Sequence, residues 1–159
     1  MMHLLTLLLT IALVDASPWT SQPGTGTVRI TVPPAVLIQI DDVSAASASA
    51  GPARISFNQA FLAAGQALRI SVMADSTLTL PGGVPVPASS ISWTTSQVNN
   101  GIGINGALSS GTYTPVYESS VGARSGRVDL TWQLALPPGI TRAGTAQVVL
   151  RWKLEAFTP

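Results

Sequence analysis

Two long segments in the last third of the chain alternate apolar and polar residues, and this period of two restricts the possible folds most. The apolar positions are Val128, Leu130, Trp132, Leu134 and Leu136 in the first segment, and Ala146, Val148, Leu150, Trp152 and Leu154 in the second. Such residues share one face of an extended chain, so both segments are predicted to be half-buried β-strands. The turn signal Pro137-Pro138-Gly139 between them predicts neighbouring strands, with the outward Asp129 and Arg151 paired across them.

The rest of the chain repeats this pattern in shorter runs that end at glycine- or proline-containing turns. Predicted strands lie at residues 27–32, 35–40, 55–57, 68–74 and 91–95. Pro33-Pro34 ends the first, the low-complexity segment from Ser44 to Pro52 is predicted to be a loop, and Asn99-Asn100-Gly101 is a hairpin or loop signal. The sequence therefore predicts an all-β fold: a two-sheet antiparallel β-sandwich, immunoglobulin-like or jelly-roll in type, forming a single domain over residues 27–159.

The N-terminus has the pattern of an export signal. An apolar run from Leu4 to Val14 is followed by small residues, which predicts a signal peptide over residues 1–16, cleaved after Ala16. The alternatives are a buried strand or helix start, and a membrane anchor, for which the run falls short of the ~20 residues that span a bilayer. Residues 17–26 are rich in Pro, Gly, Ser and Thr and predict a flexible extension. We therefore expect a secreted, periplasmic or cell-surface protein without an integral membrane span after cleavage.

The chemistry available to the mature chain is restricted, because the only histidine is His3 and there is no cysteine. Ser-His-Asp and Cys-His catalysis, zinc sites and iron–sulfur or haem ligation through these residues are thereby excluded. We expect a protein that is not an enzyme, with no catalytic residue, cofactor or metal site. The alternative is a hydrolase with a carboxylate pair drawn from Asp41, Asp42, Asp75, Glu118, Asp129 and Glu155.

Charge indicates little about partners. Charged residues form only 9% of the chain and are spread singly, so no basic patch predicts a nucleic acid partner. The adjacent Asp41-Asp42 could bind Ca²⁺, but the Asp-x-Asp-x-Asp spacing is missing and an Asx-type turn is the simpler interpretation.

Aromatic residues offer a candidate binding surface. Trp132 and Trp152 are in phase with the apolar faces and are predicted to be core residues. Trp93, Tyr113 and Tyr117 are instead a candidate sugar platform, since exposed aromatic rings stack on sugars. Glycans are therefore candidate partners, and a carbohydrate-binding module or accessory domain is the alternative function.

The order of segments resembles fimbrial and spore-coat-U-type bacterial surface subunits. The likeness consists of the export signal, an alternating N-terminal segment with glycine, a Ser/Thr/Gly-rich sandwich and a closing strand from Ala143 to Trp152. Many members carry a disulfide near the start of the domain, which this chain lacks. The resemblance implies an incomplete sandwich whose apolar groove is filled by a strand from the next subunit.

On that resemblance, the candidate donor strand presents Val28, Ile30 and Val32, within residues 25–32. The alternative is that this segment pairs inside its own domain as an ordinary first strand. We expect a structural or adhesive surface protein, with copies of itself or other surface subunits as partners, as in a fimbria-like polymer.

Overall fold

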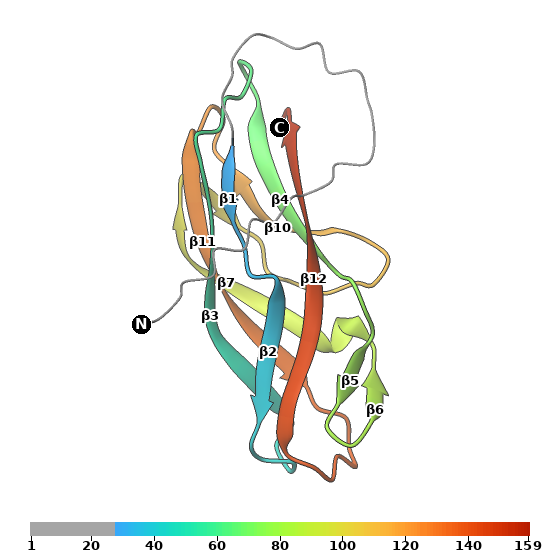
Figure 1. The fold of residues 1–159 in the computed structure, drawn as a ribbon. Helices are drawn as coiled ribbons and strands as arrows, with labels where there is room; N and C mark the ends of the chain where they lie inside the picture. Colours follow the sequence, from blue (N-terminus) through green and yellow to red (C-terminus); the bar gives the residue numbers. More distant parts are fainter. Residues whose placement is uncertain (1–27) are drawn as a thin grey trace, which may run out of the picture.

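The computed structural model describes residues 28–159. The predicted signal peptide over residues 1–16 and the predicted extension over residues 17–26 lie outside the described residues. The described chain folds as two antiparallel β-sheets that pack face to face (Figure 1). The predicted all-β, two-sheet antiparallel sandwich is therefore confirmed.

Each large sheet has five strands, all paired antiparallel. Sheet 1 has the order β1 (Arg29–Thr31), β3 (Ser47–Asn58), β11 (Ser125–Ala135), β7 (Ile91–Asn99), β9 (Gly106–Ala107). Sheet 2 has the order β2 (Ala35–Ile40), β12 (Gly144–Phe157), β4 (Ala67–Ala74), β10 (Thr114–Ser119), β8 (Gly101–Gly103). A small hairpin of β5 (Leu78–Leu80) and β6 (Val84–Val86), followed by the 3₁₀ turn η1 (Ala88–Ser90), lies between β4 and β7 in the chain.

Aromatic pairs fill the centre of the core between the sheets. The rings of Trp93 and Trp132 lie edge to face with centroids 5.5 Å apart, and those of Phe57 and Tyr117 are tilted with centroids 6.0 Å apart. Both arrangements suit the ring quadrupoles. Because Trp93 and Trp132 are directly opposite in the register of β7 and β11, this pair also joins two strands of sheet 1.

The two long C-terminal strands form as predicted, but they are not neighbours. β11 lies in the middle of sheet 1, whereas β12 lies in sheet 2. The predicted Asp129–Arg151 pair is therefore wrong: Asp129 accepts a hydrogen bond from Arg54 Nε (2.8 Å), and Arg151 pairs with Asp75. The hydrogen bonds from Arg54 hold the pKa of Asp129 below its usual value, since they stabilise the ionised carboxylate.

The low-complexity segment from Ser44 to Pro52 is mostly strand, contrary to the predicted loop. β3 already begins at Ser47, and Ser47 to Ala50 pair with the end of β11. The register shifts by one residue at Gly51-Pro52, opposite Thr131. A proline cannot donate to the ladder and is accommodated at such a bulge, which lets the strand continue on either side of it.

The side of the sandwich formed by β8 and β9 is closed by the chain itself. At Asn100 the chain leaves β7 in sheet 1 and enters β8 in sheet 2, so Asn99-Asn100-Gly101 is a crossing between sheets rather than a hairpin. Tyr117 Oη lies 2.8 Å from the carbonyl oxygens of both Asn99 and Asn100 and shares its proton between them. Trp93 Nε1 donates to the carbonyl oxygen of Ile104 (2.7 Å), where the chain returns towards β9.

Candidate functional site

The opposite side of the sandwich has an open strand edge on β12. The first half of this strand, Gly144 to Val149, pairs with β2. The second half, Leu150 to Phe157, pairs with β4 on one edge, and no strand within residues 28–159 pairs with its other edge. Figure 1 shows β2 running beside the lower half of β12 while β1 lies above β2 and belongs to the other sheet.

The two consecutive prolines explain why the edge is open. β1 and β2 are separated only by Val32, Pro33 and Pro34, yet β1 pairs with β3 in sheet 1 and β2 with β12 in sheet 2. Neither proline has an N–H to donate, so the ladder between β2 and β12 cannot continue past them. Its last bonds run to their carbonyl oxygens: Leu150 N–H donates to Pro34 (2.9 Å) and Trp152 Nε1 donates to Pro33 (2.7 Å).

These bonds also show which backbone groups point to the open edge. Leu150 N–H points towards β2, and the Val149 carbonyl oxygen points the other way, where it accepts from Asp75 N–H (2.9 Å). Because N–H and C=O directions alternate along a strand, the groups that face the open edge belong to Trp152, Leu154 and Ala156. These backbone groups are available to a further strand.

Side chains are also less buried in the second half of β12, where β2 no longer pairs with it. Ala146 and Val148 in the paired half are each 1% exposed. Trp152 and Leu154 continue the same inward alternation but are only half-buried, and Ile30 and Val32 are likewise only half-buried against the core. The apolar interior is thus less completely covered where β12 lacks a second neighbour.

The predicted donor residues belong to the first strand and its flanks. Val28, Ile30 and Val32 pack partly buried against the core of their own domain, and Arg29 to Thr31 pair with Asn58 to Ser56 of β3. The structure therefore has the arrangement that the sequence left as the alternative, an ordinary first strand. This strand is short, since its register with β3 covers only three residues.

The three aromatic residues considered as a sugar platform do not form one surface. Trp93 is 1% exposed and Tyr117 is 0% exposed, while Tyr113 is partly exposed. Burial raises the pKa of Tyr117 to about 12, because the phenolate is poorly solvated in the core. Neither buried ring has a face available to a sugar, so the platform is not supported.

The acidic residues considered for a carboxylate pair are mostly held in ion pairs. Arg69 bonds Glu118 (2.7 Å) and lies 3.5 Å from Glu155, which also pairs with Lys153 (2.6 Å). The bond from Lys153 holds the pKa of Glu155 below its usual value. A general acid needs a raised pKa instead, so these contacts favour a structural role.

Asp42 supports the turn interpretation of the acidic pair. Its Oδ1 accepts hydrogen bonds from Ser44 N–H (2.8 Å) and Ser44 Oγ (2.6 Å), which is the geometry of an Asx turn, and these bonds lower its pKa. Among residues 28–159, no group of three or more His, Cys, Asp or Glu is placed to hold a metal ion.

Comparison with known proteins identifies no relative: no family model, curated protein or solved structure matches this chain. In the part of the chain that the structure describes, no helix is long and apolar enough to cross a membrane. The open edge of β12 was missed at the level of sequence. The sequence does contain an indication of this edge in Pro33-Pro34. The two prolines separate two predicted strands that each place alternate apolar side chains towards the core.

Proposed function

We propose that this protein is a secreted, non-enzymatic structural or adhesive surface subunit that assembles by β-strand addition between copies of itself. The observation that carries the proposal is the edge of β12 from Arg151 to Phe157, with which no strand within residues 28–159 pairs. An edge with free N–H and C=O groups is a template for another strand, and proteins commonly blunt or cover such edges. The resemblance to fimbrial and spore-coat-U-type subunits and the predicted signal peptide agree with this role.

An added strand would make two kinds of contact at this edge. Its backbone would pair with the free groups of Trp152, Leu154 and Ala156, and its alternate side chains would cover the half-buried Trp152 and Leu154. Burial of apolar area contributes roughly 25 cal/mol per Å², so a few apolar side chains add several kcal/mol. The free backbone groups of this edge and the free energy of burying its apolar side chains therefore both favour β-strand addition.

The donor in this proposal is the segment that contains Val28, Ile30 and Val32, taken from a neighbouring copy. In its own domain it is held through the short register of β1 with β3 and through partly buried side chains. Leaving this position requires few ladder bonds to break, and the gain at β12 offsets their loss. A head-to-tail chain of subunits is the expected product, because the donor segment of each copy pairs with the β12 edge of the next copy.

The test uses one variant for each surface. Leu154→Asp places a charge against the acceptor edge, and Ile30→Asp places one on the donor. Matched controls are Gln147→Asp and Thr31→Asp, which make the same charge change on outward, exposed positions of β12 and β1. Circular dichroism confirms that each variant is folded, and light scattering with electron microscopy measures assembly.

The wild type and both controls are expected to form polymers, and each acceptor or donor variant alone is expected to stay monomeric. A mixture of the two variants is expected to form 1:1 dimers, since only one intact donor and one intact acceptor remain. A wild-type protein that is monomeric at all concentrations, or polymers unaffected by Leu154→Asp, would overturn the proposal.

A further inference from the structure

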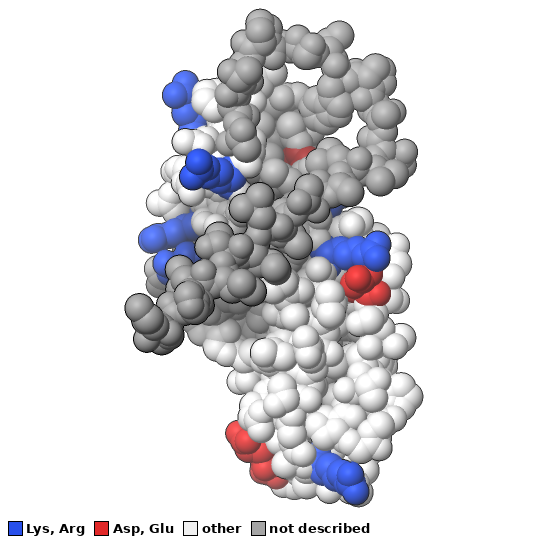
Figure 2. All heavy atoms as spheres, in the orientation of Figure 1, with Lys and Arg blue, Asp and Glu red and all other residues white. Residues whose placement is uncertain are grey.

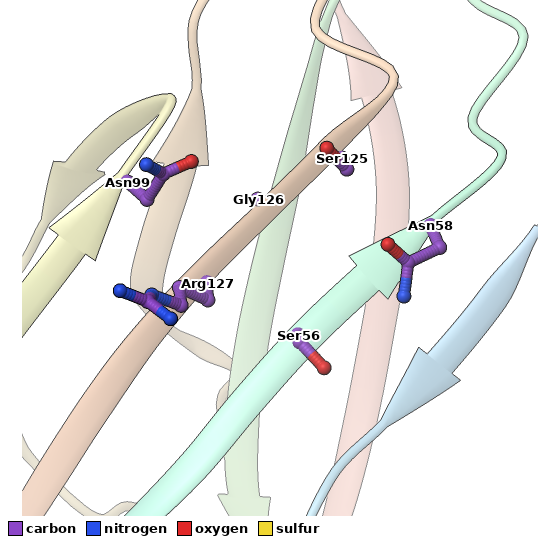
Figure 3. Close-up of a pocket in the computed structure, with 6 residues that line it drawn as sticks. All are labelled: Ser56, Asn58, Asn99, Ser125, Gly126 and Arg127. Carbon is purple, nitrogen blue, oxygen red and sulfur yellow. The ribbon is translucent and has the colours of Figure 1, made fainter.

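A polar hollow of about 290 Å³ lies on the outer face of sheet 1, whereas the open edge of β12 belongs to sheet 2. Its lining side chains come from three neighbouring strands, β3, β7 and β11: Ser56, Asn58, Asn99, Ser125 and Arg127, with the backbone of Gly126. Figure 3 shows Asn99 and Arg127 on one side of the β11 ribbon and Ser56 and Asn58 on the other, over β3.

The hollow gathers hydrogen-bonding side chains around one cation. Two hydroxyls and two amides supply donors and acceptors, and the Arg127 guanidinium supplies a planar set of donors. Within residues 28–159 this guanidinium forms no ion pair, whereas Arg54 on the adjacent strand is held by Asp129. Arg127 is exposed and keeps its binding capacity for a ligand.

The surrounding face is positive. The strands of sheet 1 carry Arg29, Arg54 and Arg127 but a single acid, Asp129. In contrast, the basic residues on the strands of sheet 2, Arg69, Arg151 and Lys153, each pair with a carboxylate. Figure 2 shows basic atoms gathered along the side of the molecule where Figure 1 places β3 and β11. An anionic ligand is therefore favoured at the hollow.

Unusual backbone conformations surround the same hollow. Among the described residues, the only non-glycine residues with positive φ are Gln59 (61°), Gln97 (50°) and Asn100 (55°). Gln59 follows Asn58, and the other two flank Asn99. A bulge at Gln97-Val98, opposite Val128, changes the direction of the strand just before Asn99. Asn100 Nδ2 donates to the Ser125 carbonyl oxygen (3.0 Å), and this bond holds the edge of the hollow in place. Such conformations cost free energy and concentrate at binding sites.

From these observations we infer that the hollow binds a saccharide that carries a carboxylate, such as a uronate unit of an acidic polysaccharide. The Arg127 fork takes the carboxylate in a bidentate pair, and the flanking hydroxyls and amides take the sugar hydroxyls. At about 290 Å³ the hollow is just below the ~300–1,000 Å³ range of small-molecule sites, which suits a single sugar unit. This site does not use the edge of β12, although two of its residues, Ser56 and Asn58, lie on β3 opposite Thr31 and Arg29 of β1.

The test is an NMR titration of the isotope-labelled protein with three probes: trigalacturonate, the neutral maltotriose, and citrate, which is anionic but not a sugar. Trigalacturonate is expected to shift the side-chain signals of Asn58, Asn99 and Arg127 Nε. Arg127→Gln is expected to weaken its binding by about tenfold or more, and Arg127→Lys less, since lysine keeps the charge without the fork.

The matched control is Arg151→Gln, which removes one arginine from the outer face of sheet 2. It is expected to leave trigalacturonate binding within twofold of wild type. The inference is overturned if trigalacturonate causes no shifts or shifts elsewhere, if maltotriose or citrate binds as tightly, or if Arg127→Gln binds like wild type. Because both arginines are exposed, these variants are expected to fold normally.

Discussion

The two sides of the sandwich differ in how far the chain covers the edges of the sheets. On the β8 and β9 side the chain crosses between the sheets at Asn100 and again near Ile104, and buried aromatic side chains bond to the crossings. On the β1 and β2 side the chain crosses at Pro33-Pro34 and again between β2 and β3, and beyond the prolines no strand within residues 28–159 pairs with the outer edge of β12.

The difference shows what decides whether a sandwich edge is closed. Both sides have short edge strands, and both crossings use indole N–H groups as donors to backbone oxygens, from Trp93 and from Trp152. Glycines let the chain pass close to Tyr117 on the first side, whereas prolines end the ladder on the second. Local backbone chemistry at a few residues therefore selects which side remains open to another strand.

The largest expected effect is on the closed side, at Gly101→Ala. A Cβ here would lie within 2.6 Å of Tyr117 Cζ and against the backbone oxygen of Glu118, neither of which can move freely. We expect a loss of about 2–3 kcal/mol in the free energy of unfolding, measured by urea denaturation. Gly51→Ala is the control, because its Cβ would meet nothing within 4 Å. An equal, small effect of both substitutions would show that the crossing is not tightly packed.

A second pair of substitutions compares the two halves of β12. Val148→Ala removes two carbons from a residue that is 1% exposed, and Leu154→Ala removes three from a half-buried one. We expect losses of about 2 kcal/mol for Val148 and about 1 kcal/mol for Leu154, since burial outweighs size. The measurement is denaturation of the monomer. A larger loss for Leu154 would mean that the second half of β12 is as well covered as the first.

A third prediction concerns the hydroxyl that holds the crossing at Asn100. Tyr117→Phe removes the bonds to two carbonyl oxygens and is expected to cost about 1 kcal/mol, whereas the partly exposed Tyr113→Phe should change little. Since burial raises the pKa of Tyr117 to about 12 from its ordinary value of 10.0, the unfolded state releases this proton first. The wild type should therefore lose stability as the pH rises from 10 towards 12, and Tyr117→Phe should lose less.

The strands of this fold could be predicted from alternation, but their partners could not. β11 and β12 have the same period and a turn signal between them, so the sequence favours one hairpin. The structure separates them into two sheets because β3 and β7 flank β11 while β2 and β4 flank β12. Such pairings join residues far apart in the sequence, and no local pattern carries that information.

The buried aromatic residues show a second limit of prediction from the sequence. Trp93 shares the inward phase of Ile91 and its burial follows from alternation. Tyr117 does not: a bulge between Pro115 and Tyr117 turns both Val116 and Tyr117 inward, which breaks the period of two. Alternation cannot locate a bulge, and the polar hollow beside the bulge in β7 was missed for the same reason.

The smallest expected effect is on the outer face of the open half of β12. Glu155 is opposite Arg69 in the register of β12 with β4 and also pairs with Lys153 on its own strand. The contact with Arg69 helps to hold β12 against β4. Glu155→Gln should cost about 0.5 kcal/mol near neutral pH, as expected for pairs exposed to solvent.

The bond from Lys153 lowers the pKa of Glu155 in the folded state from its ordinary value of 4.5. A lowered carboxyl pKa stabilises the fold above pH 4.5, and this contribution is lost as the pH falls through the lower folded-state value. The difference between wild type and Glu155→Gln should therefore shrink below about pH 4, as measured by thermal unfolding at several pH values. A difference that stays constant with pH would mean that the side chain acts through packing, and the open half of β12 would then depend on the backbone ladder with β4 and on apolar contacts.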